Sequence, residues 1–220
     1  GAVLVNTGGS PSVGVSIANA NFWDNFSTGL HVESKGNIIL TNTAAWDNDG
    51  AGGVSGAYLN NATGTGYIKV TNPKSTDLDM FAGFNNNHDH GLDIFTNGTV
   101  TLTNVNVQDN QETGVRIWQE LNKGVTMTNC RVDGNGSLSE YGISIFTIGP
   151  VVISGGHANN NAADGLHVNN SIADDALPKP VTIKNFTANG NGNYGVYVTS
   201  KGAIALSSGK NLKRDGACRI

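Results

Sequence analysis

The chain has 220 residues, of which only 14% are charged, and its formal net charge is −4. That charged share is well below the roughly 25% of an average soluble protein, and the chain is instead rich in Gly, Asn and Thr. A disordered chain has the opposite composition. A nucleic-acid partner would need a basic stripe, which this acidic chain lacks. No apolar run approaches the roughly 18 residues that span a bilayer. We therefore expect one folded domain over residues 1–220, with no nucleic-acid partner and no membrane insertion. Because the chain starts inside a strand-like apolar run, we interpret this domain as a segment of a longer protein.

One phrase, Gly-apolar-any-apolar, recurs along the chain. Its glycines are Gly29, Gly56, Gly91, Gly114, Gly142, Gly165 and Gly195, and Gly1 begins a partial copy. Apolar residues that alternate with period two indicate half-buried strands and not helices. A spacing of about 25 residues between copies is typical of a repeat architecture.

Two further phrases follow the first. The second is an apolar-any-apolar run that ends in a small polar residue, often Asn, and it starts at Ile38, Val100, Val125 and Val181. The third is a small apolar residue three positions before an Asn, as at Ala45, Val107, Val132, Ala158 and Ala188. One coil of such short strands cannot bury its inward side chains alone, but coils stacked in register bury them and pair their backbones. We therefore predict an all-β parallel β-helix, a solenoid of about eight coils.

The recurring asparagines fall at the predicted corners of the coils. Asn tolerates the left-handed backbone conformation and hydrogen-bonds its own backbone at turns. Stacked coil over coil, two sets of asparagines are expected to form amide ladders whose members satisfy one another. The first set is Asn42, Asn104, Asn129 and Asn185, and the second is Asn48, Asn110, Asn135, Asn161 and Asn191.

The two cysteines, Cys130 and Cys218, fall about three or four coils apart in this register, and at roughly 4.8 Å per coil they are beyond the reach of a disulfide. We expect two free thiols, with Cys130 as a small core residue.

These repeats resemble those of the pectate-lyase-like superfamily of single-stranded right-handed parallel β-helices, and the resemblance extends over nearly the whole chain. The runs at 91–110 and 195–208 are also similar to long bacterial surface or secreted proteins that carry many such coils. The superfamily includes lyases, hydrolases, epimerases and phage tailspikes, so the resemblance implies the fold but not one activity. The Asp-Pro-His-Glu motif of the epimerases is absent, and so is the ordered motif set of the polygalacturonases.

The outward positions of the first strand phrase stack into two files. One file reads His31, Tyr58, Asp93, Arg116, Ser144, His167 and Tyr197, and the other reads Glu33, Asn60, Phe95, Trp118, Phe146, Asn169 and Thr199. Aromatic rings at this spacing can stack on sugar rings or on a partner protein. The candidate ligand-binding residues are therefore Tyr58, Phe95, Trp118, Phe146 and Tyr197. The alternative is an aromatic ladder covered by a loop or a neighbouring domain, and the loops at 72–80 and 172–179 could line or fill this face.

Asp93 and Arg116 lie on adjacent coils of one file. In a lyase, Arg116 would neutralise a uronate carboxylate or abstract a proton, with Asp93 tuning it. The alternative is an ordinary cross-strand ion pair. His167 and Glu120 complete the candidate catalytic set of an enzyme that acts on acidic polysaccharide.

Two stretches carry side chains of metal-ligand type. His88-Asp89-His90 has suitable residues, but three adjacent turn residues rarely point at one ion and no fourth ligand is evident, so we interpret them as solvated turn residues. Asp47-Asn48-Asp49-Gly50 is similar to the start of a calcium loop, but Tyr58 stands where that loop ends in Glu. We predict no cofactor and no metal site, with calcium at 47–50 as the alternative.

Together these observations favour a non-catalytic scaffold or adhesin-like module, secreted or on a bacterial cell surface. Its partner would be carbohydrate or another surface protein, bound through the aromatic file. The alternatives are a polysaccharide lyase or hydrolase, and a pure spacer within a longer solenoid.

Overall fold

The computed structural model describes residues 1–8, 13–50, 52–74, 83–137, 139–171, 179–207 and the backbone of 218–219. Most of the two loops at 72–80 and 172–179 lies outside these residues, so their expected place beside the aromatic face stays a prediction. In the part of the chain that is described, no helix is long and apolar enough to cross a membrane.

Two long parallel sheets make up the molecule. The first sheet contains β1 (Ala2–Asn6), β3 (Leu30–Ser34), β5 (Ala57–Asn60), β8 (Leu92–Thr96), β11 (Val115–Gln119), β13 (Ile143–Phe146), β15 (Leu166–Asn170), β17 (Val196–Ser200) and β19 (Cys218–Arg219). The second contains β2 (Val15–Trp23), β4 (Ile38–Trp46), β6 (Ile68–Thr71), β9 (Val100–Thr103), β12 (Val125–Asp133), β14 (Val151–His157), β16 (Val181–Lys184) and β18 (Ile204–Ser207). Two short strands, β7 (Phe84–Asn85) and β10 (Asn106–Gln108), pair with the far ends of β4 and β12.

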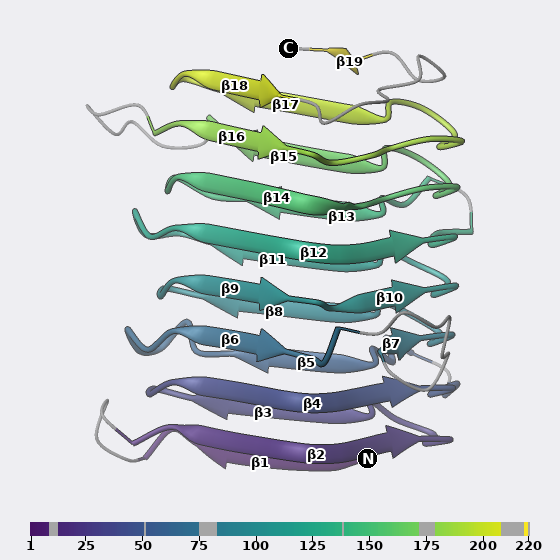
Figure 1. Ribbon diagram of the computed structural model, residues 1–220. Helices are drawn as coiled ribbons and strands as arrows, with labels where there is room; N and C mark the ends of the chain where they lie inside the picture. The colour runs from purple at the N-terminus through teal and green to yellow at the C-terminus, as the bar shows by residue number, and fades with distance from the viewer. Residues whose placement is uncertain are drawn as a thin grey trace.

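The strands stack as successive coils of one solenoid, from the N-terminal coil in purple to the C-terminal coil in yellow (Figure 1). Leu92, Val115, Ile143 and Leu166 are register partners on four consecutive strands of the first sheet. The strands β1 to β17 of that sheet bound about seven full turns, which agrees with the eight coils expected once the partial terminal ones are counted. The predicted parallel β-helix is therefore confirmed.

The core follows from the period-two alternation. Inward residues such as Leu92, Val115 and Ile143 have no exposed surface, whereas their neighbours in the strand point outward. Burial of each aliphatic side chain contributes roughly 1.5–3 kcal/mol. Cys130 lies in this core as a free thiol, and burial raises its pKa to about 11. The side chain of Cys218 lies outside the described residues.

The second predicted amide ladder is confirmed and is longer than expected. In each step the Nδ2 of one asparagine donates to the Oδ1 of the next at 2.7 to 3.1 Å. The ladder runs through Asn25, Asn48, Asn87, Asn110, Asn135, Asn161 and Asn191. The second amide proton reaches a carbonyl oxygen of the preceding coil, as from Asn110 to Phe84 at 2.8 Å. Buried amides in this corner therefore have both donors and the acceptor satisfied.

The ladder also explains the repeated glycine. A Cβ built on Gly142 would lie 2.6 Å from both Nδ2 of Asn161 and the carbonyl oxygen of Gly165. Gly56 has the same relation to Nδ2 of Asn87 and the carbonyl oxygen of Gly91. The first phrase starts with Gly because the ladder leaves no room for a side chain at that position.

The first predicted ladder is wrong as a ladder, although its asparagines do form turns. Asn42, Asn104, Asn129 and Asn185 have φ of 49°, 54°, 51° and 51°. Among the described members only Asn42 is bonded to another amide, donating to Oδ1 of Asn19 at 2.8 Å. Asn42, Asn129 and Asn185 are exposed, and the half-buried Asn104 donates to the backbone carbonyl of Asn72 at 3.1 Å. The αL backbone, and not amide pairing, therefore explains the asparagine at these corners.

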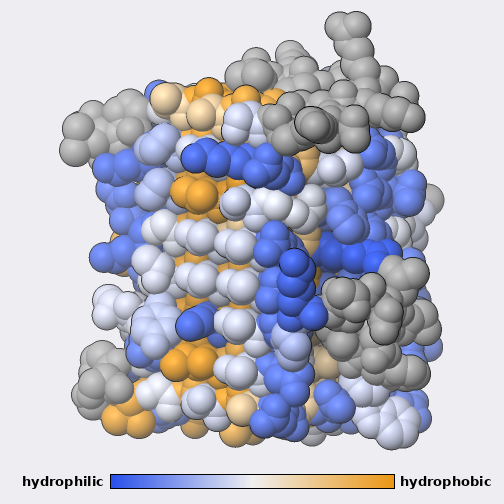
Figure 2. All heavy atoms as spheres, in the orientation of Figure 1, coloured by the Kyte–Doolittle hydropathy of each residue, from blue (hydrophilic) through white to orange (hydrophobic). Residues whose placement is uncertain are grey.

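The outward face of the second sheet carries several small, uncharged polar side chains. Its described outward positions along β9, β12 and β16 carry half-buried threonines, Thr101, Thr126 and Thr182. Figure 2 shows pale columns in the middle of this side, with hydrophobic orange at several levels and hydrophilic blue along the edges. The second sheet does carry one stacked pair, Trp23 and Trp46, at the ends of β2 and β4. The longer run of rings over successive coils lies on the first sheet, and a binding site is best sought there.

Candidate functional site

The two predicted outward files of the first sheet are present in the expected register. Phe95 pairs with Trp118, and Trp118 pairs with Phe146, on β8, β11 and β13. In the parallel file Asp93 pairs with Arg116, and Arg116 pairs with Ser144. A parallel sheet places such partners directly above one another, so side chains far apart in the chain form one surface.

The rings of this face contact one another along the stack. Trp118 and Phe146 are stacked with centroids 5.2 Å apart, and His167 and Tyr197 are stacked at 4.8 Å. Tyr58 lies 5.7 Å from the ring of Phe95. The five candidate ligand-binding residues therefore belong to one aromatic face. Trp118 is the most open of them, with 40% of its surface exposed.

A cleft of about 420 Å³ lies in the middle of this face. It is lined by His90, Phe95, Glu112, Thr113, Arg116, Trp118, Glu140, Tyr141, Ser144 and Phe146. Three of the five predicted ligand-binding residues are in the lining, whereas Tyr58 and Tyr197 lie beyond it on neighbouring coils. The volume is in the usual range of small-molecule sites, roughly 300–1,000 Å³.

Arg116 and Asp93 form a two-pronged ion pair at the floor of the cleft. Nε and Nη2 of Arg116 donate to the two carboxylate oxygens of Asp93 at 2.8 and 2.6 Å. Burial works against the guanidinium charge, but the hydrogen bonds and charge of Asp93 outweigh it and raise the pKa of Arg116. The guanidinium also lies over the ring of Phe95, 5.4 Å from its centroid. This geometry holds Arg116 in one orientation with its charge largely balanced.

The proposed catalytic set does not form one constellation. Nδ1 of His167 lies 2.9 Å from the carboxylate of Asp164, one coil beyond Ser144. Glu120 accepts a hydrogen bond from the indole of Trp118 at 3.2 Å and does not line the cleft with Arg116. Only Asp93 and Arg116 come together, and they satisfy each other.

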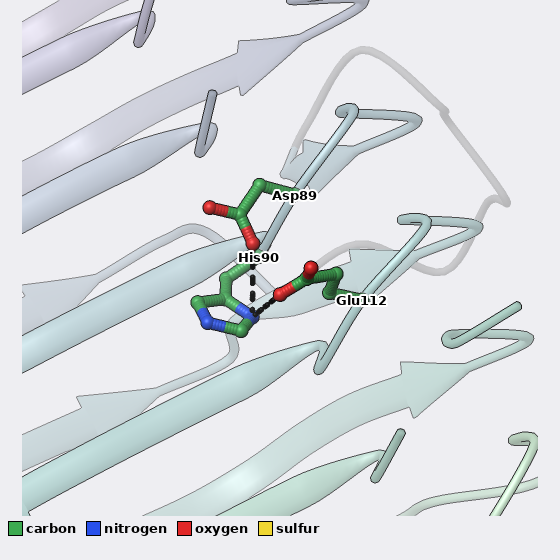
Figure 3. Close-up of side chains that lie close together, drawn as sticks. All are labelled: Asp89, His90 and Glu112. Carbon is green, nitrogen blue, oxygen red and sulfur yellow. Dashed lines mark ion pairs between the residues drawn. The ribbon is translucent and has the colours of Figure 1, made fainter. Parts of the chain in front are cut away.

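A second group lies in the corner ahead of β8 and β11. Nδ1 of His90 is 3.5 Å from Oδ1 of Asp89 and 3.5 Å from Oε2 of Glu112. In Figure 3 the two carboxylates point at the same ring nitrogen from different coils. The interpretation of 88–90 as solvated is therefore wrong for His90, whose side chain is only 4% exposed.

The charges of this group are shifted by their surroundings. Burial, reinforced by the charge of Arg116, lowers the pKa of His90, so its imidazole is neutral at neutral pH. A hydrogen bond with Asp89, with partial burial and the charges of Asp89 and Glu140, raises the pKa of Glu112 to about 7. The carboxyl group of Glu112 is therefore partly protonated near neutral pH.

Glu112 is the residue that sequence reasoning missed, although the repeat contains a signal for it. Asp89, Glu112 and Glu140 each stand two positions before a repeat glycine, namely Gly91, Gly114 and Gly142. Equal offsets in successive coils stack, and the amide of Glu112 donates to the carbonyl of Asp89 at 3.3 Å. The position two before the glycine therefore forms an acidic file, of which Glu112 and Glu140 line the cleft.

The predicted alternative of calcium at 47–50 is not supported by the geometry. The amide of Asn48 is a buried member of the ladder, and its Oδ1 accepts from both the backbone and the side chain of Asn25. Asp47 accepts a hydrogen bond from Asn86 at 2.5 Å. The only group of three metal-ligand side chains found among the described residues is Asp89, His90 and Glu112.

Comparison with known proteins identifies the family. No curated protein and no solved structure matches the chain. The family model described as the right-handed β-helix region matches residues 82–213, more than half of the chain and the whole lining of the cleft. The chain therefore belongs to the right-handed β-helix family.

Proposed function

We propose that this protein is a non-catalytic carbohydrate-binding scaffold, and that its site is the cleft on the first sheet. The observation that carries the proposal is the ring set Phe95, Trp118 and Phe146, on three adjacent coils of one cleft. Sugar rings present apolar faces that stack on such side chains. A rigid sheet holds the rings in place before the ligand arrives, which lowers the entropic cost of binding.

The polar groups around the rings supply directional contacts. Ser144 offers a hydroxyl group, and Arg116 and Glu140 offer charged hydrogen-bonding groups. The hydroxyl of Thr113 donates to Glu140 at 2.7 Å and positions that carboxylate. A few placed polar groups among apolar walls are the usual composition of a small-molecule site.

The charge balance favours a neutral sugar over a polyuronate. Asp93 neutralises Arg116, which leaves Glu112 and Glu140 as the remaining acidic groups of the lining. Carboxylates of an acidic polysaccharide would be repelled here. The same balance argues against a lyase in which Arg116 neutralises a uronate.

A second candidate is a glycoside hydrolase, favoured by one observation. Glu112 and Glu140 line the same cleft, and a pair of carboxyl groups is what most glycoside hydrolases use. Release of new reducing ends from neutral oligosaccharides, abolished by Glu140→Gln, would favour this candidate over simple binding.

We further propose that the module acts outside the cell, as a secreted or cell-surface protein of bacterial type. A rigid stack of coils suits a spacer that holds the cleft away from its attachment point. The occupant would be a glycan or the surface of another protein.

Calorimetric titration with neutral and acidic oligosaccharides tests the binding. We expect a neutral oligosaccharide to bind, and Trp118→Ala to weaken that binding by about tenfold. Val152→Ala is the matched control, because Val152 is 39% exposed on the second sheet and should leave the affinity unchanged. If no oligosaccharide binds, or if Trp118→Ala binds as well as the unaltered chain, the proposal is wrong.

A further inference from the structure

The corner ahead of β8 and β11 contains buried polar atoms without hydrogen-bond partners. Nδ1 of His90 and Oδ1 of Asp89 are buried, and neither makes a hydrogen bond. The side chain of His90 is 4% exposed and that of Asp89 is 16% exposed. An unsatisfied buried polar group costs roughly 1–3 kcal/mol, so two of them side by side require an explanation.

The distances between these atoms are too long for hydrogen bonds, but they fit atoms that coordinate one cation. Nδ1 of His90 is 3.5 Å from Oδ1 of Asp89 and 3.5 Å from Oε2 of Glu112, beyond the 2.7–3.2 Å of a normal hydrogen bond. A tetrahedral cation bound at about 2.0–2.1 Å separates its ligand atoms by about 3.4 Å. Figure 3 shows both carboxylates directed at the one nitrogen atom.

We infer that Asp89, His90 and Glu112 form a binding site for a first-row divalent cation of the Zn²⁺ class. The three ligand atoms lie within 4.8 Å of one another. One imidazole nitrogen and two carboxylates are a donor set that Zn²⁺ binds, and the charge of two carboxylates balances that of a divalent cation. Imidazole nitrogen suits Zn²⁺ and its neighbours, whereas Ca²⁺ and Mg²⁺ prefer an all-oxygen set.

The site leaves one coordination position of the cation open. Three ligands come from the protein, and His90 and Glu112 both line the cleft, so a fourth position faces it. Water or a group of a bound molecule could complete the coordination there. The cation would also offset the carboxylates of the cleft wall, which links this site to the charge of the adjacent surface.

The ligands come from two coils that the fold holds in fixed register. Asp89 and His90 immediately precede the glycine before β8, and Glu112 holds the corresponding place before β11. The amide of Glu112 donates to the carbonyl of Asp89 at 3.3 Å. The backbone therefore prepositions all three side chains, and binding requires no change of fold.

Titration of the metal-stripped 220-residue chain with Zn²⁺, with Ca²⁺ and Mg²⁺ in parallel, tests the site by calorimetry and thermal unfolding. We expect one Zn²⁺ per chain, a raised Tm with Zn²⁺, and no comparable effect of Ca²⁺ or Mg²⁺. Co²⁺ bound in the same place should give the intense visible absorption of a four-coordinate centre.

Three variants locate the ion. Glu112→Gln keeps the shape of an exposed side chain and should weaken Zn²⁺ binding at least tenfold. Glu140→Gln, at the same position of the next coil, and His88→Ala, in the same turn but outside the group, should leave it intact. Absence of Zn²⁺ binding, equal binding by Glu112→Gln, or loss of binding in His88→Ala would each overturn the inference.

Discussion

At the scale of single residues, one amide per coil supports the corner of the solenoid. Asn110 donates to Asn135, accepts from Asn87 and donates to the carbonyl oxygen of Phe84. It is almost fully buried, so no water can replace these bonds. Its Nδ2 also packs where a Cβ on Gly91 would stand, at 2.6 Å. The recurring Asn and the recurring Gly are thus the two partners of one packing contact, in which the amide occupies the space that a side chain on Gly would need.

The ladder leads to a stability prediction. We expect Asn110→Ala to lower the free energy of unfolding by about 2–4 kcal/mol. It removes the amide that accepts from Nδ2 of Asn87 and donates to Oδ1 of Asn135 and the carbonyl of Phe84, all in a buried site. Urea denaturation followed by circular dichroism measures the change.

The matched control is Asn185→Gly, at an exposed αL corner with φ of 51°. Glycine adopts that backbone without strain, so this variant should unfold close to the unaltered chain. Equal destabilisation by the two variants would mean that the ladder amides are no more important than any other asparagine.

At the scale of elements, neighbouring strands are also tied together by side chains at their ends. The carboxylate of Asp133, at the end of β12, accepts from Arg131 at 2.7 Å and lies 3.0 Å from Nε2 of His157 on β14. It also accepts from the backbone amide of Asn159 at 2.9 Å. Burial acts against the charge, but these bonds to His157, Arg131 and Asn159 prevail and lower the pKa of Asp133.

This contact gives the stability a definite dependence on pH. Because the pKa of Asp133 is lower in the folded state, its contribution is complete above the unfolded value of about 3.9 and is lost as pH falls through the folded value. We expect Asp133→Asn to lower the free energy of unfolding by about 1 kcal/mol at pH 7, with the difference shrinking towards pH 3. Denaturant unfolding across that pH range measures it.

Asp109 provides the opposite case on the same corner. Burial, with the charge of Asp133, raises its pKa, so its ionised form is disfavoured by folding. Asp109→Asn, which fits the αL backbone there (φ of 55°), should not destabilise the protein at pH 7. A loss of stability as large as that of Asp133→Asn would contradict this assignment of the two carboxyl groups.

At the scale of the whole molecule, each inward residue is covered by the coils on either side of it. A solenoid therefore has its tightest core in the middle and its loosest at the ends. Ile117 is fully buried on β11, whereas Ile17 on the terminal β2 is only partly buried. The cleft and the group of Asp89, His90 and Glu112 lie over coils whose inward residues are fully buried.

The position in the stack should control the cost of a core truncation. We expect Ile117→Ala to lower the free energy of unfolding by about 2–5 kcal/mol, because the coils above and below cannot collapse into the cavity that it leaves. Ile17→Ala should cost less, since solvent already reaches that side chain. Guanidinium unfolding of both variants is the measurement, and an equal cost would argue against a core that tightens toward the middle.

Much of this architecture was readable before any coordinates, because a repeat determines its own register. The period-two alternation predicted inward Leu92, Val115 and Ile143, and the spacing of Asn110, Asn135 and Asn161 predicted their contact. The Arg116–Asp93 pair was also foreseen, because residues at one offset in adjacent coils must stack.

The two wrong predictions, the first amide ladder and the exposure of His90, share a different cause. For Asn42, Asn104, Asn129 and Asn185 the same periodicity suggested amide pairing. At these outward corners, however, three of the side chains are exposed and that of Asn104 bonds to the backbone instead, so what the four share is the αL backbone. For His90 the period showed a turn but not on which side of it the ring would lie. Burial at a corner depends on how the chain enters the next strand, which a repeat pattern does not encode.

By itself, the sequence determined the parallel β-helix, its register and the aromatic face, since all three follow from residue spacing and from backbone pairing that every coil repeats. The tertiary structure alone decided which parts of that face form a cleft and which carboxylates meet His90. Those features depend on side-chain orientation at corners between coils of unequal length, where neighbours from two coils and the local burial, not the period, determine the outcome.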